Sequence, residues 1–103
     1  MSKVIENIQA GIVEFLGTFI LCFMGGFAVL NSETNKTAED ITISGVALAH
    51  GLTLAFIVWA GGPISGGHYN PAETLTLAGL KRIEIGKSIL YIACQLLGAV
   101  CAG

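Results

Sequence analysis

The amino-acid sequence predicts an all-α membrane protein with two transmembrane helices, one re-entrant half-helix and a third helix cut short. Hydrophobic residues make up 53% of the chain and charged residues only 12%, and the mean hydropathy of +0.76 is high for a soluble domain. No Asp, Glu, Lys or Arg occurs between Asp40 and Glu73. A helix predicted around Glu73 is too short to cross a bilayer.

The first two apolar segments are each long enough to cross a bilayer. Residues 8–30 carry a single charge, Glu14, and these 23 residues can span the hydrocarbon core with some tilt. A polar loop is expected over 31–40. A second span is expected over 41–60, and it contains His50.

The stretch 61–80 is predicted to form a re-entrant loop followed by a half-helix. Its initial Gly-Gly-Pro sequence is expected to end the second span. Asn70 is a preferred N-cap residue, and Pro71 falls at the first helical position, where its missing N–H costs nothing. Ten helical residues would be about 15 Å long, roughly half of the hydrocarbon core. Residues 88–103 begin a third span but stop after 16 residues, inside a helix.

The cations predict the orientation of the chain in the membrane. Lys36 would lie on one side, and on the other would lie Lys3, Lys81, Arg82 and Lys87. The positive-inside rule therefore predicts a multi-pass membrane protein with a cytoplasmic N-terminus. The half-helix then enters from the cytoplasm with Asn70 deepest, preceded by non-helical backbone. Such backbone is tolerated at that depth only where it is buried in protein or lines a water-filled cavity, so an aqueous path is implied.

Charge and cysteine spacing exclude several kinds of site. The net charge is −2 and no basic patch suggests a nucleic-acid partner. The three cysteines lie in apolar stretches without metal-ligand spacing, so we expect no metal, no cofactor and small buried side chains at Cys22, Cys94 and Cys101. An intramembrane enzyme using Ser65, His68 or Glu73 is disfavoured, because the chain has neither a nucleophile-elbow pattern nor paired acids.

Four short motifs follow one another along the chain: Glu14-Phe15-Leu16-Gly17-Thr18, Ala49-His50-Gly51-Leu52, Ser65-Gly66-Gly67-His68-Tyr69-Asn70-Pro71-Ala72 and Gln95-Leu96-Leu97-Gly98-Ala99. Together they resemble the first-helix, second-helix, first Asn-Pro-Ala loop and third-helix signatures of the aquaporin (major intrinsic protein) family. The resemblance makes 1–103 the first aquaporin-like repeat, which is one half of an inverted-repeat fold. The family's second Asn-Pro-Ala motif and filter arginine are absent from this sequence.

The resemblance implies a passive channel for water and small neutral solutes such as ammonia, glycerol or urea, with this chain as its N-terminal half. It implies that the Asn70 amide donates to permeating water within the motif completed by Pro71 and Ala72. It also implies that permeating molecules, passing in single file, donate hydrogen bonds to the backbone carbonyls of Gly66, Gly67, His68 and Tyr69. The implied partners are the lipid bilayer, a missing second repeat and a homotetramer. Plasma membrane and vacuole-type membrane both stay open.

Three polar residues have a second interpretation. His50 lies 20 residues before Asn70, where the family places its second-helix selectivity-filter residue, and tonoplast intrinsic proteins are similar in having His there. The alternative is a polar side chain satisfied between helices. For Asn70 the alternative is a plain helix cap. Glu14 is an intramembrane acid and so a functional candidate, but the resemblance implies a buried support that accepts hydrogen bonds from the loop backbone.

Glu73 departs from the family, which usually has a small apolar residue after Asn-Pro-Ala. Glu73 is the third helical residue, so we expect a capping box in which it accepts from the Asn70 N–H. The alternative is a carboxylate that weakens the barrier to cations at the positive end of the helix dipole.

A second class of function stays open beside the channel. A lone inverted repeat cannot close a pore, so the chain could instead be a non-conducting membrane interaction subunit, or a truncated fragment that needs a second half.

Overall fold

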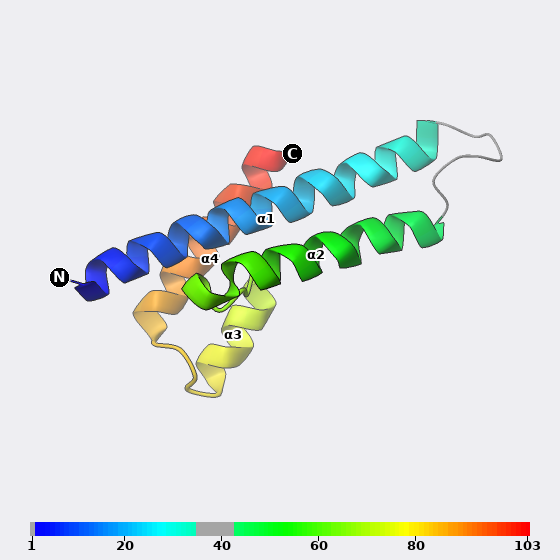
Figure 1. The fold of residues 1–103 in the computed structure, drawn as a ribbon. Helices are drawn as coiled ribbons and strands as arrows, with labels where there is room; N and C mark the ends of the chain where they lie inside the picture. The colour runs from blue at the N-terminus through cyan, green and yellow to red at the C-terminus, as the bar shows by residue number, and fades with distance from the viewer. Residues whose placement is uncertain (1, 35–42) are drawn as a thin grey trace.

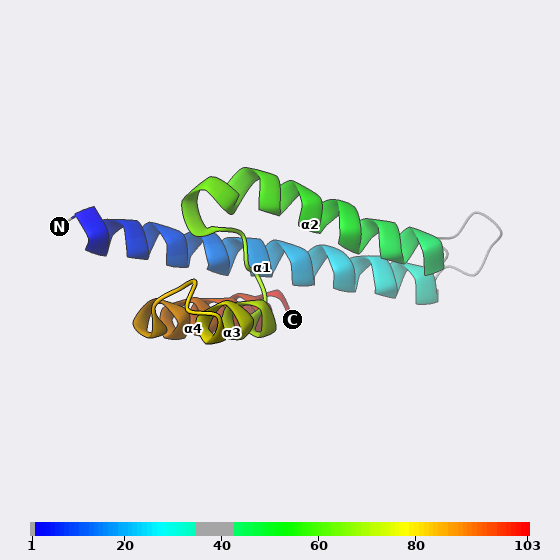
Figure 2. The ribbon, with the colours of Figure 1, turned by 90° about the horizontal axis from the view of Figure 1, so that it is seen from below.

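The computed structural model describes residues 2–34 and 43–103, which form four helices: α1 (Ser2–Thr34), α2 (Ile43–Ser65), α3 (Pro71–Gly79) and α4 (Ile85–Ala102). The long helix α1 is the centre of the arrangement (Figure 1). It contacts α2 on one side and α4 on the other, and α3 contacts α4. Figure 2 shows α2 along one side of α1, with α3 and α4 together on the opposite side.

The predicted all-α membrane class is confirmed for the part of the chain that the structure describes, although its third long helix is not too short to cross a membrane. Three helices, α1, α2 and α4, are long and apolar enough to cross a membrane. The helix α3 has nine residues, about 14 Å in length, which is roughly half of the hydrocarbon core. It runs back toward the end of the molecule that holds the N-terminus (Figure 1).

The predicted end of the second span is wrong. The helix α2 continues through its Gly-Gly-Pro sequence and ends at Ser65, with Pro63 inside it. Pro63 has no N–H to donate to the Trp59 carbonyl, so α2 lacks one helix hydrogen bond in its last turn. The turn is still closed beyond it, because Gly66 N donates to the Gly62 carbonyl at 2.7 Å.

The first and third spans are longer than 8–30 and 88–103. The helix α1 reaches Thr34, and the rest of the loop predicted over 31–40 lies outside the described residues. The helix α4 begins at Ile85, because Ser88 N donates to the Glu84 carbonyl at 2.9 Å and adds a first turn.

The interior of this chain is mainly polar and its surface mainly apolar. Most large apolar side chains of the three long helices are exposed, and α2 buries only Ile57, Gly61 and Ser65. The buried polar side chains are Glu14, Thr18, Ser65, His68, Thr74, Ser88 and Gln95. This distribution is the reverse of a soluble domain and suits a chain covered by lipid or by other membrane helices.

The expectation of buried cysteines is wrong for two of the three. Cys22 and Cys101 are exposed and Cys94 is partly buried. All three lie on long helices whose outer faces no other described element covers, so their apolar surroundings in the sequence did not predict their burial.

Small residues bring α1 and α4 together closely enough for their backbones to meet. A Cβ atom at Gly98 would lie 2.4 Å from the Phe15 carbonyl oxygen and 3.2 Å from the Phe19 nitrogen. Contacts of this kind are typical of membrane helix pairs, in which packing rather than hydrophobic burial drives association.

We predict that Gly98→Ala destabilises the chain by about 1–3 kcal/mol, because the two helices must separate to admit the methyl group. Unfolding in mixed detergent micelles measures this loss. Gly86→Ala is the matched control in the same helix, since a Cβ there meets nothing within 4 Å. That control should be neutral or stabilising by up to about 1 kcal/mol. Equal stability of the two variants would contradict the close α1–α4 contact.

Candidate functional site

The segment between α2 and α3 is a loop whose backbone conformation is favoured by its two glycines. Three of its residues have positive φ: Gly66 at 90°, Gly67 at 68° and Tyr69 at 53°. Glycine reaches this region without steric cost, whereas for tyrosine it costs about 1–2 kcal/mol. The backbone at Tyr69 must therefore be held by contacts with the rest of the chain.

Glu14 provides the central contact. Its side chain is fully buried, and it lies in α1 opposite the loop. Its Oε2 accepts a hydrogen bond from Ser65 Oγ at 2.9 Å. Its Oε1 accepts from the Tyr69 backbone N–H at 2.9 Å and from Gln95 Nε2 at 2.7 Å. One carboxylate thus joins α1 to the end of α2, to the loop and to α4.

A second set of hydrogen bonds ties the loop to the first turn of α3. Thr74 Oγ1 accepts a hydrogen bond from Gln95 Nε2 at 3.0 Å. It is also hydrogen-bonded to His68 Nδ1, at a distance of 2.9 Å between the two atoms. The Tyr91 hydroxyl donates to the Ser65 carbonyl at 2.5 Å, and its ring meets the His68 ring edge-on with centroids 5.0 Å apart. His68 is therefore a buried brace of the loop.

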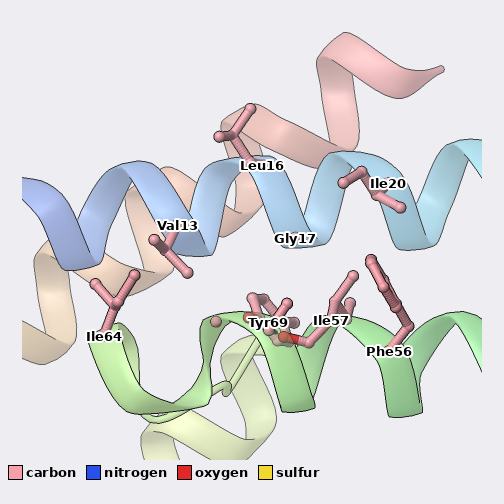
Figure 3. Close-up of a pocket in the computed structure, with 10 residues that line it drawn as sticks. Val13, Leu16, Gly17, Ile20, Phe56, Ile57, Ile64 and Tyr69 are labelled. Carbon is pink, nitrogen blue, oxygen red and sulfur yellow. Dashed lines mark hydrogen bonds between the residues drawn. The ribbon is translucent and has the colours of Figure 1, made fainter.

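The Tyr69 side chain points away from the loop and lies between α1 and α2 (Figure 3). Its hydroxyl donates to the Ile57 carbonyl at 2.6 Å. Glycines make the room: a Cβ at Gly17 would lie 2.0 Å from the ring, and one at Gly61 would lie 2.1 Å from the hydroxyl. The same residues border an apolar crevice of about 200 Å³. Because its side chain is held between α1 and α2, Tyr69 contributes only its backbone to the loop.

Asn70 caps α3 as the sequence predicts. Its Oδ1 accepts from Ala72 N at 2.9 Å, and Pro71 follows at the first helical position. Asn70 is exposed, and within the described residues its amide nitrogen makes no hydrogen bond. The capping box expected at Glu73 is absent there, because its exposed carboxylate makes no hydrogen bond to the Asn70 N–H. Thr74 N donates to the Asn70 carbonyl at 3.1 Å, which is an ordinary helix hydrogen bond of the first turn.

His50 lies on α2, separate from the hydrogen bonds around Glu14. Its Nδ1 is 2.8 Å from the Val46 carbonyl, an acceptor only, so Nδ1 carries the proton in the neutral ring. The other nitrogen, Nε2, then holds the lone pair. Gly25 of α1 makes room for the ring, because a Cβ there would lie 2.3 Å from Nε2.

The sequence did not predict several members of the hydrogen-bonded cluster. No sequence pattern predicts a role for Thr74 or Tyr91, and Gln95 is predicted only as part of a motif. The sequence does hold a signal for Gln95, because a polar side chain inside an apolar span needs a partner. No group of His, Cys, Asp or Glu that could hold a metal ion occurs in residues 2–34 and 43–103.

A profile of the Major intrinsic protein family matches residues 1–103, from the first residue of the sequence to the last. The chain belongs to the Major intrinsic protein family. The short motifs at Glu14, His50, Asn70 and Gln95 all lie within that match.

Relatives in the Major intrinsic protein family show how much of a family member this chain covers. It is 42% identical to aquaporin TIP4-4 of Zea mays over 98 residues, which is 92% of this chain and 39% of the relative. It is 37% identical to aquaporin NIP3-1 of Arabidopsis thaliana, covering 95% of this chain and 30% of the relative. The chain therefore spans well under half the length of these relatives.

A solved structure from the Major intrinsic protein family has the same arrangement of helices. The crystal structure of the aquaglyceroporin from Plasmodium falciparum superposes with a TM-score of 0.81 at 32% sequence identity. The match covers 93% of this chain and 39% of that chain.

We predict that Ser65→Ala destabilises the chain by about 2–4 kcal/mol, because two buried groups each lose a partner worth about 1–3 kcal/mol. Ser65 Oγ donates to Glu14 and also accepts from Gly67 N at 3.1 Å. Unfolding in mixed micelles gives the free energy, and amide hydrogen exchange at Gly67 locates the loss. Ser44→Ala, at an exposed position of α2, is the matched control. A Gly67 amide equally protected in both variants would contradict the role of Ser65.

Proposed function

We propose that this chain forms the first half of a passive transmembrane channel for water and small neutral solutes. The observation that carries the proposal is the helix α3, which is half a bilayer long and begins at an exposed Asn70 after a loop of tightly held backbone. Irregular backbone at membrane depth fits a protein that encloses a wet path. Membership of the Major intrinsic protein family supports the same function.

Asn70 is the proposed donor to the permeant. Its oxygen is used for the α3 cap, which leaves the amide N–H₂ directed to other partners. A donor fixed in this way orients a passing water and interrupts a continuous proton wire. The N-terminus of α3 adds a partial positive charge that opposes cations. Pro71 and Ala72 set the geometry of this first turn.

The backbone carbonyls of Gly66, Gly67, His68 and Tyr69 are the proposed acceptors. In the described part of the chain, they accept none of the hydrogen bonds that hold the loop. The loop is fixed by its N–H groups and side chains, through Glu14 and Ser65. The carbonyl oxygens are therefore available to accept hydrogen bonds from permeating molecules. The proposed role of Glu14 is to support the loop.

His50 is the proposed selectivity-filter residue. Its Nδ1–H donates to the Val46 carbonyl, so only Nε2, which lies beside Gly25 of α1, is left as an acceptor for a permeant that can donate. A histidine makes a constriction more polar than a phenylalanine would. The proposed permeants are therefore water together with ammonia, glycerol or urea.

The proposed channel needs partners beyond this chain. It requires an oppositely oriented second repeat to close the pore, a lipid bilayer, and a homotetramer as the assembled form. We place the N-terminus in the cytoplasm because the cations cluster at that end. The sequence favours neither plasma membrane nor vacuole-type membrane. The proposal involves no covalent step, cofactor or nucleic acid, and so no enzyme activity.

A chimera tests the proposal. The matching segment of aquaporin TIP4-4 of Zea mays is replaced by this chain, and the product is reconstituted in proteoliposomes for stopped-flow light scattering under an osmotic step. We predict water flux well above empty vesicles. Asn70→Asp keeps the capping oxygen but loses the donor, and should lower the flux about fivefold, equivalent to one net hydrogen bond of about 1 kcal/mol.

Two controls make that result interpretable. The unmodified maize protein sets the reference flux, and Glu33→Gln, at an exposed position near the far end of α1, should leave the chimera unchanged. A folded, membrane-inserted chimera with background flux would contradict the proposal and favour a non-conducting interaction subunit. An Asn70→Asp flux equal to that of the parent chimera would overturn the role of Asn70.

A further inference from the structure

Three cations from different parts of the chain meet at one end of the molecule. Lys3 comes from the start of α1, Arg82 from the α3–α4 connection and Lys87 from the first turn of α4. They border a hollow of about 280 Å³, here called the basic pocket, together with Glu6, Asn7, Ile83 and Glu84. None of these residues takes part in the hydrogen bonds around Glu14.

The connection that carries Arg82 is held in a fixed shape. Lys81 N donates to Ala78 O at 3.1 Å, and Arg82 N donates to Leu77 O at 2.8 Å. This pair of hydrogen bonds is the Schellman ending of a helix, in which the residue at the Lys81 position is usually glycine. Lys81 has a φ of 60°, so a cation occupies a strained position where glycine would cost less.

The charges around the basic pocket are only partly neutralised. Lys3 Nζ lies 3.0 Å from a Glu84 carboxylate oxygen, but the side chains are 71% and 69% exposed, so this pair is weak. Lys87 Nζ lies 5.6 Å from the centre of the Tyr91 ring. In the part of the chain that the structure describes, no carboxylate pairs with Arg82 or Lys87. The pocket therefore offers positive charge to an external anion.

Exposed apolar side chains lie on the same two helix ends as these cations. Val4 and Ile8 on α1 are 63% and 54% exposed, and Ile85 and Ile89 on α4 are 74% and 65% exposed. They belong to helices apolar enough to span a membrane. The basic pocket thus lies where the apolar surface of the spans gives way to charged residues, which is the level of the lipid headgroups.

We propose that the basic pocket binds the headgroup of an anionic phospholipid whose acyl chains lie on the exposed isoleucines of α1 and α4. A free anion would use the cations alone, whereas a lipid would also use the apolar side chains on the same helix ends. Arg82 can form two parallel hydrogen bonds to a phosphate, and Lys87 adds a point charge. The lipid would join the start of α1 to the start of α4. This inference does not depend on whether the chain conducts water.

Native mass spectrometry of the detergent-solubilised chain tests the proposal. The probes are phosphatidylglycerol and phosphatidylcholine with identical acyl chains, titrated separately. We predict that phosphatidylglycerol is retained more strongly, and that Arg82→Gln and Lys87→Gln each lower its affinity about fivefold. Glu6→Gln removes an acid from the pocket and should raise the affinity, whereas Glu33→Gln near the other end of α1 should leave it unchanged.

The Lys81→Gly variant shows whether a change in the stability of the chain alone alters lipid binding. Glycine relieves the strained φ and should stabilise the chain, and because Lys81 does not line the basic pocket, phosphatidylglycerol binding should stay within about twofold of the unmodified chain. Equal retention of the two lipids by the unmodified chain would overturn the proposal. Unchanged affinity in both the Arg82→Gln and Lys87→Gln variants would also overturn it. Displacement of the lipid by an equal concentration of glycerol phosphate would show a site for soluble anions instead of a lipid.

Discussion

The Glu14 carboxylate is the interaction on which the rest of this structure depends. It is fully buried and it accepts hydrogen bonds from Ser65, from the Tyr69 backbone and from Gln95. An acid in an apolar helix is costly unless such donors surround it, so its burial and the loop position require each other. Asn70 directly follows the residue that Glu14 holds. The carboxylate thereby fixes where α3 begins and which way the Asn70 amide can face.

Close contacts at glycines complement this polar interior. Gly17 and Gly61 leave room for the Tyr69 side chain between α1 and α2, and Gly98 lets α4 approach the backbone of α1. A Cβ at any of the three positions would lie within 2.4 Å of another heavy atom. The chain therefore combines directional hydrogen bonds inside with tight backbone contacts between helices. Its apolar side chains face outward, where lipid and further membrane helices would cover them.

Local signals in the sequence predicted most of the fold but less of the site. The apolar spans, the Asn70 cap and the half-length of α3 all depend on neighbouring residues, and these predictions are confirmed. The predicted end of α2 is wrong because Pro63 does not break the helix, which continues to Ser65. The Glu73 capping box and the burial of Cys22 and Cys101 were also wrong. The bonds from Gln95 to Glu14 and Thr74 join distant residues, and no local pattern specifies them.

The most direct test of this account is amide hydrogen exchange at Tyr69 in the full 103-residue chain, compared between the unmodified protein and Glu14→Met in lipid nanodiscs. Methionine keeps the length and helix propensity of the side chain but offers no oxygen acceptor. If Glu14 holds the loop, the Tyr69 amide should exchange at least about tenfold faster, equivalent to a lost buried partner of about 1–3 kcal/mol. Amides in the middle of α1 and α4 should stay protected, which shows that the helices remain folded. An unchanged Tyr69 rate in a folded variant would contradict the claim that this carboxylate positions the loop.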